Sequence, residues 1–158
     1  IKDKGLYLMG HSFGGSAVSI AASRGAPIKG LILLDPALVT KKVKPMLKKI
    51  QIPSIILGAD KRVFRSRRRD SFFRLLAGSK VSVDIAGATH NDAQLPSIHT
   101  VRWGVDPYTN SRLQKFFVQN ILVGLFSISM SGNLDFVWER FQREIRRGRL
   151  TKGKSHIR

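Results

Sequence analysis

The chain has 158 residues, which is enough for one domain with a buried core, and 42% of its residues are hydrophobic. It contains no cysteine, which excludes a disulfide framework and a thiolate metal site. Lysine and arginine number 28 against 10 aspartate and glutamate, and the resulting formal charge of +18 favours anionic partners without naming a function.

The chain begins with a strand–turn–helix pattern. Residues 6–9 are a short apolar run typical of a buried strand, and residues 15–23 are mostly small residues that suit a helix packed tightly on a sheet. Between them, residues 10–15 read GHSFGG, which matches G-x-S-x-G. This pattern is typical of a sharp turn that raises a serine hydroxyl above a sheet at a helix N-terminus. We therefore interpret Ser12 as a nucleophile and His11 as a residue that shapes the turn.

The next two apolar runs predict two more buried strands. Residues 31–34 are followed by Asp35, and residues 54–59 are followed by Asp60. Because neither run alternates with polar residues, both are expected in a parallel sheet that is covered on both faces. Residues 41–50, between the two runs, predict a short helix limited by an internal proline.

Residues 65–76 predict a helix with its apolar residues facing inward and its arginines facing solvent. Residues 80–88 alternate between apolar and polar and predict a fourth strand at the sheet edge, followed by a polar loop with His90.

Two long helices are expected in the last third of the chain. A helix start is predicted at residues 106–108, with a helix over residues 111–129 and another over residues 134–147. The second of these helices is expected to place four apolar residues on one face: Phe136, Val137, Phe141 and Ile145. Residues 148–158 are basic and are expected to form a disordered tail.

Strands that alternate with helices predict an α/β domain over residues 1–147, with a mostly parallel sheet and flanking helices. The longest apolar stretch, residues 116–130, is interrupted by polar residues and is too short to span a bilayer comfortably.

Four polar residues lie just past the ends of predicted strands, where parallel α/β sheets gather their functional groups: Ser12, Asp35, Asp60 and His90. A serine hydroxyl attacks only when a base takes its proton and an acid holds that base in one tautomer. The chain order serine, aspartate, histidine is the order expected of one such triad. No other histidine follows a strand in this way, and His99 and His156 are expected to be ordinary surface residues.

Four segments together carry a resemblance to a known family: GHSFGG, LILLDPA, PSIILGA and GATH. Over about residues 5–130 the chain is similar to the C-terminal half of an α/β-hydrolase. Within that superfamily it resembles the branch of platelet-activating-factor acetylhydrolases, chlorophyllases and dienelactone-hydrolase-like or polyester-hydrolase-like esterases. The resemblance implies an α/β-hydrolase fold and ester hydrolysis by a Ser-His-Asp triad, with no cofactor and no metal.

The family has further strands before the nucleophile strand, together with a loop that supplies the second oxyanion donor. The chain lacks these strands, so we expect it to be the C-terminal portion of a larger hydrolase or a truncated gene product, with low solubility and very low activity in isolation.

The resemblance leaves two candidates for the acid. Most of the superfamily places it after the strand that corresponds to residues 54–59, where Lys61 takes the usual acid position and Asp60 lies one residue early. The acetylhydrolase and chlorophyllase branch places it one strand earlier, in a stretch like L-D-P that Asp35 matches. We favour Asp35 and keep Asp60 as the alternative. In either case the backbone N–H of Phe13 is the expected oxyanion donor.

Two other interpretations stay open. The charge could make the chain a module that binds nucleic acid or an anionic membrane, through residues 61–69 and the basic tail, although no recognised nucleic-acid-reading motif is present and nucleic acid is not the expected partner. The chain could also keep the hydrolase fold without the activity. The expected partner is a small-molecule or lipid ester, and contact with an anionic lipid interface is an additional interpretation. The ester, the compartment and the oligomeric state are not predicted.

Overall fold

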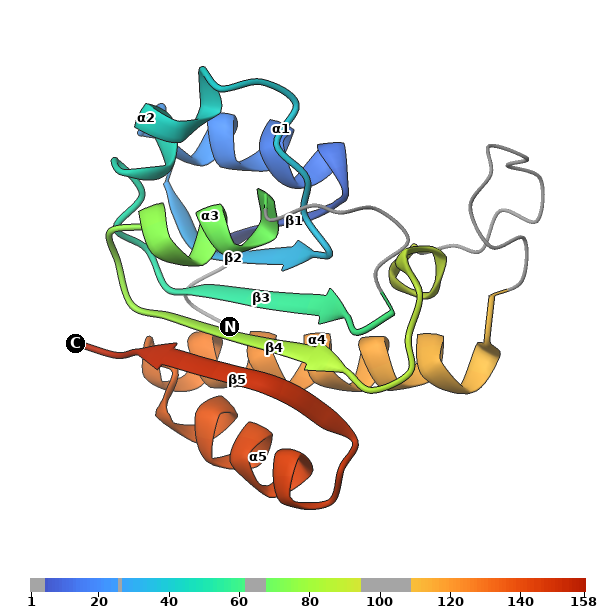
Figure 1. Cartoon of the computed structure of the whole chain (residues 1–158). Helices are drawn as coiled ribbons and strands as arrows, with labels where there is room; N and C mark the ends of the chain where they lie inside the picture. The colour runs from blue at the N-terminus through green and yellow to red at the C-terminus, as the bar shows by residue number, and fades with distance from the viewer. Residues whose placement is uncertain (1–4, 26, 62–67, 95–108) are drawn as a thin grey trace.

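The computed structural model describes residues 5–25, 27–61, 68–94 and 109–158. These residues form an α/β domain around one five-stranded sheet with the order β1-β2-β3-β4-β5 (Figure 1). The first four strands are parallel, and the last runs antiparallel to its neighbour. The strands are β1 (Leu6–His11), β2 (Ile28–Leu34), β3 (Ser54–Ala59), β4 (Lys80–Ile85) and β5 (Leu150–His156).

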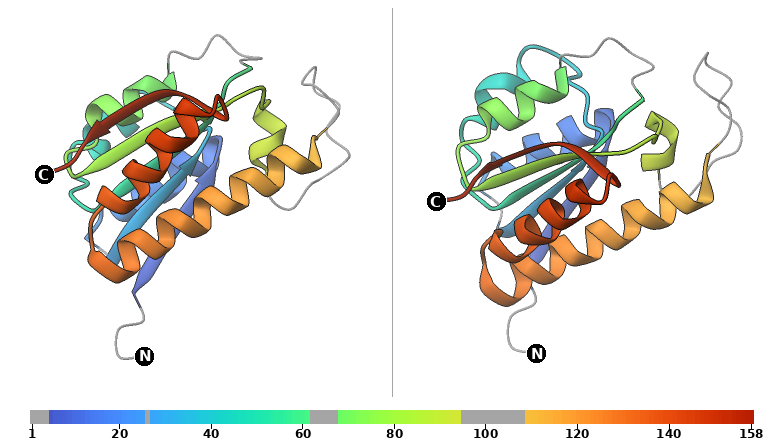
Figure 2. Two further views of the ribbon diagram at one scale, coloured as in Figure 1. Left: turned by 90° about the horizontal axis from the view of Figure 1, so that it is seen from below. Right: turned by 60° about the horizontal axis from the view of Figure 1, so that its bottom comes forward.

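Helices cover both faces of the sheet (Figures 1 and 2). One face carries α1 (Phe13–Ala22), α2 (Val43–Leu47) and α3 (Arg68–Leu75). The other carries α4 (Ser111–Ser131) and α5 (Asp135–Arg146), and a short 3₁₀ helix, η1 (His90–Ala93), follows β4. The predicted α/β class with a mostly parallel sheet is therefore confirmed.

Alternate residues of the central strands enter different layers of the core. In β2, Ile32 and Leu34 pack with α4 and α5, whereas Leu31 and Leu33 pack with the helices on the opposite face. Both faces are buried, which explains why these strands read as continuous apolar runs.

Helix α4 lies very close to the sheet. A Cβ added at Gly124 would lie 2.4 Å from Cδ1 of Ile55, so this glycine allows the helix to approach β3. By length and composition α4 is the one described helix that could cross a bilayer, but its inner face is part of the core through Phe117, Ile121 and Ile128. Its exposed side carries Val118, Leu122, Phe126 and Met130.

Residues 150–156 are not the disordered tail that we expected. They form β5, which pairs antiparallel with β4, and β4 is therefore not at the edge of the sheet. The chain reverses at Gly148, which has a φ of 69°. Composition missed this strand because five of its seven residues are exposed and Leu150 is its one large apolar residue, while the contacts that place it are backbone hydrogen bonds to β4.

The expected helix faces need one correction. Val137 and Phe141 of α5 are fully buried, but Phe136 is 47% exposed and its ring lies edge-on against Phe126. The buried face of α5 is formed by Val137, Phe141 and Glu144, and Phe136 lies outside it. The predicted helix start at residues 106–108 and His99 lie outside the described residues, and His156 is an exposed residue of β5.

In the described part of the chain, β1 pairs only with β2, so its outer edge has no strand partner there. Leu6 and Met9 are exposed on this strand.

Candidate active site at the carboxyl edge of the sheet

Ser12 joins β1 to α1 in a strained turn. Its backbone has φ 53° and ψ −123°, a conformation that few non-glycine residues adopt. Its N–H donates to the carbonyl of Leu34 at 3.0 Å, and its own carbonyl accepts from the N–H of Ala37 at 2.9 Å. These two bonds fasten the serine turn to the loop that follows β2.

Glycine is required at two positions of this turn. A Cβ added at Gly10 would lie 2.4 Å from the carbonyl oxygen of Gly14, and one added at Gly15 would lie 2.7 Å from Cβ of Pro36. The glycines therefore let the turn close and let α1 approach the loop after β2, as the motif predicts.

Asp35 ends β2 and also has an unusual backbone, with φ 36°. Its N–H donates to the carbonyl of Leu57 at 2.7 Å, and its Oδ1 accepts from the N–H of Ala59 at 3.2 Å. Its Oδ2 accepts from Nδ1 of His90 at 2.6 Å. The carboxylate therefore bridges the ends of β2 and β3 to the loop after β4.

His90 begins η1, and its loop is held by a buried capping arrangement. The carboxylate of Asp92 accepts from the N–H of Thr89 at 2.8 Å and from its hydroxyl at 3.0 Å, and also from the N–H of Asn110 at 2.6 Å. Because Nδ1 of His90 donates to Asp35, Nε2 is the ring nitrogen left to act as a base. Within the described residues, which include Ser12 and His90, no hydrogen bond joins these two side chains.

His11 packs against His90. The two ring centroids lie 4.5 Å apart, and Nε2–H of His11 donates to the carbonyl of His90 at 3.0 Å. Burial, and then the neighbouring His90, lower the pKa of His11 from 6.5 to about 4. At neutral pH the His11 side chain is therefore uncharged, and it holds the backbone of His90 without repelling a protonated imidazole.

The surroundings keep Asp35 ionised. Burial by itself raises the pKa of this carboxyl, but the hydrogen bond from His90 and the positive charges of Arg69 and His90 outweigh it, with a further contribution from the N–H of Ala59. The net pKa of Asp35 is below its ordinary value. Asp35 is therefore negatively charged at neutral pH and can orient His90.

Asp60, the alternative acid, is engaged elsewhere. Its Oδ1 accepts from Nζ of Lys152 at 2.8 Å and from the hydroxyl of Thr151 at 3.4 Å. The Lys152 hydrogen bond is the main reason that the pKa of Asp60 lies below its ordinary value. The structure thus brings Asp35, and not Asp60, to His90.

Phe13 is the first residue of α1, so its N–H has no acceptor within the helix. In the described part of the chain this N–H makes no hydrogen bond. It remains free for an oxyanion next to Ser12.

Arg69 was expected in solvent, but the structure buries it beside Asp35. Its guanidinium pairs with Oδ1 of Asp35 through Nη1, donates to the carbonyl of Ala59 at 3.1 Å, and pairs with Oδ2 of Asp84 at 2.6 Å. Helical periodicity did not single out this arginine among its neighbours. Asp84 gave no signal either, because it is one of the polar positions of an alternating strand that we expected at the sheet edge, and only the structure shows that it is buried.

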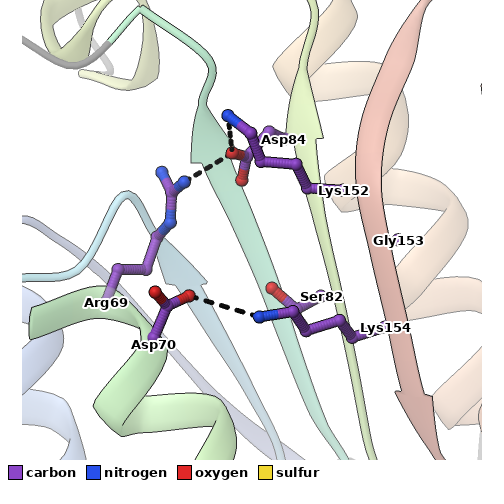
Figure 3. A pocket seen from close by; sticks show the side chains of 7 residues that line it. All are labelled: Arg69, Asp70, Ser82, Asp84, Lys152, Gly153 and Lys154. Carbon is purple, nitrogen blue, oxygen red and sulfur yellow. Dashed lines mark hydrogen bonds and ion pairs between the residues drawn. The ribbon is translucent and has the colours of Figure 1, made fainter. Parts of the chain in front are cut away.

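A cavity of about 260 Å³ lies beside this arginine, between α3, β4 and β5 (Figure 3). Its lining includes Arg69, Asp84 and Lys152, but not Ser12, Asp35 or His90. Within the described residues, no cluster of three or more histidine, aspartate or glutamate side chains is placed to hold a metal ion.

A scan against protein-family models finds no match for this chain, and a search of curated proteins finds none either.

Proposed function

We propose that this protein is a serine hydrolase of the α/β-hydrolase type that cleaves carboxylic esters, either small molecules or lipids. The observation that carries the proposal is the 2.6 Å hydrogen bond between His90 and Asp35, next to a serine held in a strained strand-to-helix turn. Strain of this kind is concentrated where function requires it. Among the described non-glycine residues, positive φ angles occur at Ser12, Asp35 and Lys152.

In the proposed reaction, the Ser12 hydroxyl attacks the ester carbonyl while Nε2 of His90 takes its proton. His90 then passes the proton to the leaving alcohol, and water hydrolyses the acyl-enzyme by the reverse sequence. Asp35 stabilises the protonated His90, and the N–H of Phe13 donates to the oxyanion. The hydrogen bond between Ser12 and His90 forms when the substrate is seated, because catalytic contacts often tighten only in the complex.

The test is covalent labelling with a fluorophosphonate probe, together with hydrolysis of a p-nitrophenyl ester. We expect Ser12→Ala to abolish both labelling and hydrolysis, because the attacking oxygen is lost. In an intact serine hydrolase the same loss lowers turnover by about a million-fold. The matched control is Ser129→Ala on the exposed side of α4, which should keep both probe labelling and ester hydrolysis. Retention of more than a few per cent of the activity in Ser12→Ala would end the proposal.

The same probe separates the proposed enzyme from an inactive copy of the fold, since an inactive copy would not be labelled at Ser12. The interpretation as a basic binding module gains no support from the three cations around the cavity. Arg69, Lys152 and Lys154 are each paired with carboxylates, which reduces the charge that they offer to an anionic partner.

A further inference from the structure

We propose that Arg69 is a positioning residue that holds the carboxylate of Asp35 in place for His90 and, together with Asp84, sets how strongly that carboxylate favours the protonated imidazole. This inference rests on the proposed function, because it assigns Asp35 and His90 to one catalytic unit.

The first support is the way in which the Asp35 carboxylate is held. Its Oδ2 faces Nδ1 of His90, while its Oδ1 is bound by Arg69 and by the N–H of Ala59. A carboxylate with partners at both oxygens cannot rotate without breaking a charged contact. Arg69 therefore fixes the orientation of the oxygen that meets His90.

The second support is the close fit of the guanidinium. Arg69 is 7% exposed and Asp84 is 3% exposed. A Cβ added at Gly58 would lie 2.2 Å from Nη1 of Arg69 and 2.5 Å from Oδ1 of Asp84, so β3 has room for this ion pair only because residue 58 is glycine. A buried charge placed this closely has few alternative positions.

The third support is the alternation of charge through the network. His90 is faced by Asp35 and His11, and Asp35 is faced in turn by Arg69. On its other side Arg69 meets Asp84, which Lys152 also approaches at 3.3 Å (Figure 3).

The positive charge of Arg69 weakens the hold of Asp35 on a protonated His90, and the negative charge of Asp84 offsets part of that effect. Removing Arg69 and removing Asp84 should therefore act on His90 in opposite directions.

The experiment is an NMR titration of the His90 ring in the full chain, with its resonance identified by its loss in His90→Gln. Arg69→Met should move the titration midpoint to higher pH, because Asp35 then acts unopposed. Asp84→Asn should move it to lower pH, because Arg69 loses its counter-charge. Arg74→Met, on the exposed side of α3, is the matched control and should leave the midpoint unchanged.

Activity gives a second measurement. The acidic limb of the kcat/KM profile should move with the ring titration, and Arg69→Met should lower kcat by as much as about 100-fold, because Asp35 loses an anchor. Arg69→Lys, which keeps the charge, should restore the midpoint toward its original value.

Unchanged midpoints in both variants, or shifts in the same direction, would overturn the inference. If Arg69→Met does not fold, the sign of the shift in the near-isosteric Asp84→Asn decides alone. Failure of the proposed function is a separate outcome: the unaltered protein would then not be labelled at Ser12. The ring titration would still test the role of Arg69, because it needs no turnover.

Discussion

Two neighbouring turns at the carboxyl edge of the sheet each carry an aspartate, but the fold uses them differently. Asp35, after β2, has an unusual backbone and is paired with His90 on one side and with the buried Arg69 on the other. Asp60, after β3, has a side chain that is 32% exposed, and it pairs with Lys152.

The difference originates in β5. Because β5 runs antiparallel to β4, it begins where β4 ends, with Thr151 opposite Asp84. This arrangement brings Thr151 and Lys152 to Asp60 and occupies its carboxylate. Asp35 lies one strand farther from β5 and keeps one oxygen for His90. A basic segment far from Asp35 and His90 in sequence thus gives the two acids different partners.

The largest expected effect comes from replacing each acid by its amide. Asp35→Asn should lower kcat/KM for a p-nitrophenyl ester by about 10,000-fold, because an amide cannot hold the His90 tautomer or stabilise its charge. Asparagine tolerates positive φ, so the backbone should persist. Asp60→Asn should stay within about two-fold, because surface ion pairs contribute little.

Circular dichroism at neutral pH should show the unaltered protein and both variants folded, so that a difference in kcat/KM reports on the catalytic step and not on unfolding. Strong loss in Asp60→Asn with near-normal activity in Asp35→Asn would reverse the comparison and make Asp60 the triad acid.

The next effect concerns His11. This residue packs against His90, the partner of Asp35, and has no counterpart at Asp60 among the contacts described above. Its folded pKa of about 4 lies below the ordinary value of 6.5, so the unfolded chain binds the proton first as pH falls. The native state should therefore lose about 2 kcal/mol from this residue between pH 6.5 and pH 4.5. His11→Gln should remove that part of the loss, as measured by urea unfolding at several pH values.

Gln142→Ala, at an exposed position of α5 without a titratable group, is the control, and it should leave the slope of unfolding free energy against pH as it is in the unaltered protein. An equal effect of both substitutions would show that burial beside His90 is not the cause.

The smallest effect tests how the serine turn is fitted to the loop that carries Asp35. Gly15→Ala should cost about 1 kcal/mol of unfolding free energy, because its Cβ would lie 2.7 Å from the ring of Pro36. Gly14→Ala should be neutral or slightly stabilising, since nothing lies within 4 Å of its added Cβ and alanine favours a helix. Thermal unfolding of the pair measures the difference, and equal costs would indicate that the turn and the loop do not press on each other.

Much of the candidate site could be predicted from local pattern. GHSFGG requires a sharp turn after a strand, and the apolar runs before Asp35 and Asp60 place both acids at the same edge of a parallel sheet. The burial of Arg69 in α3 could not be predicted in the same way, because it depends on Gly58 in β3 and Asp84 in β4. The strand character of residues 150–156 likewise depends on the free edge of β4.

The sequence by itself determined the α/β class, the position of the serine turn and the set of polar residues at the strand ends, because hydrophobic periodicity and glycine requirements act over a few neighbouring residues. Tertiary structure alone decided that His90 meets Asp35, that Arg69 is buried beside it and that β5 occupies Asp60. These contacts depend on strand order and close approach, which join residues 34 to 92 positions apart in the chain.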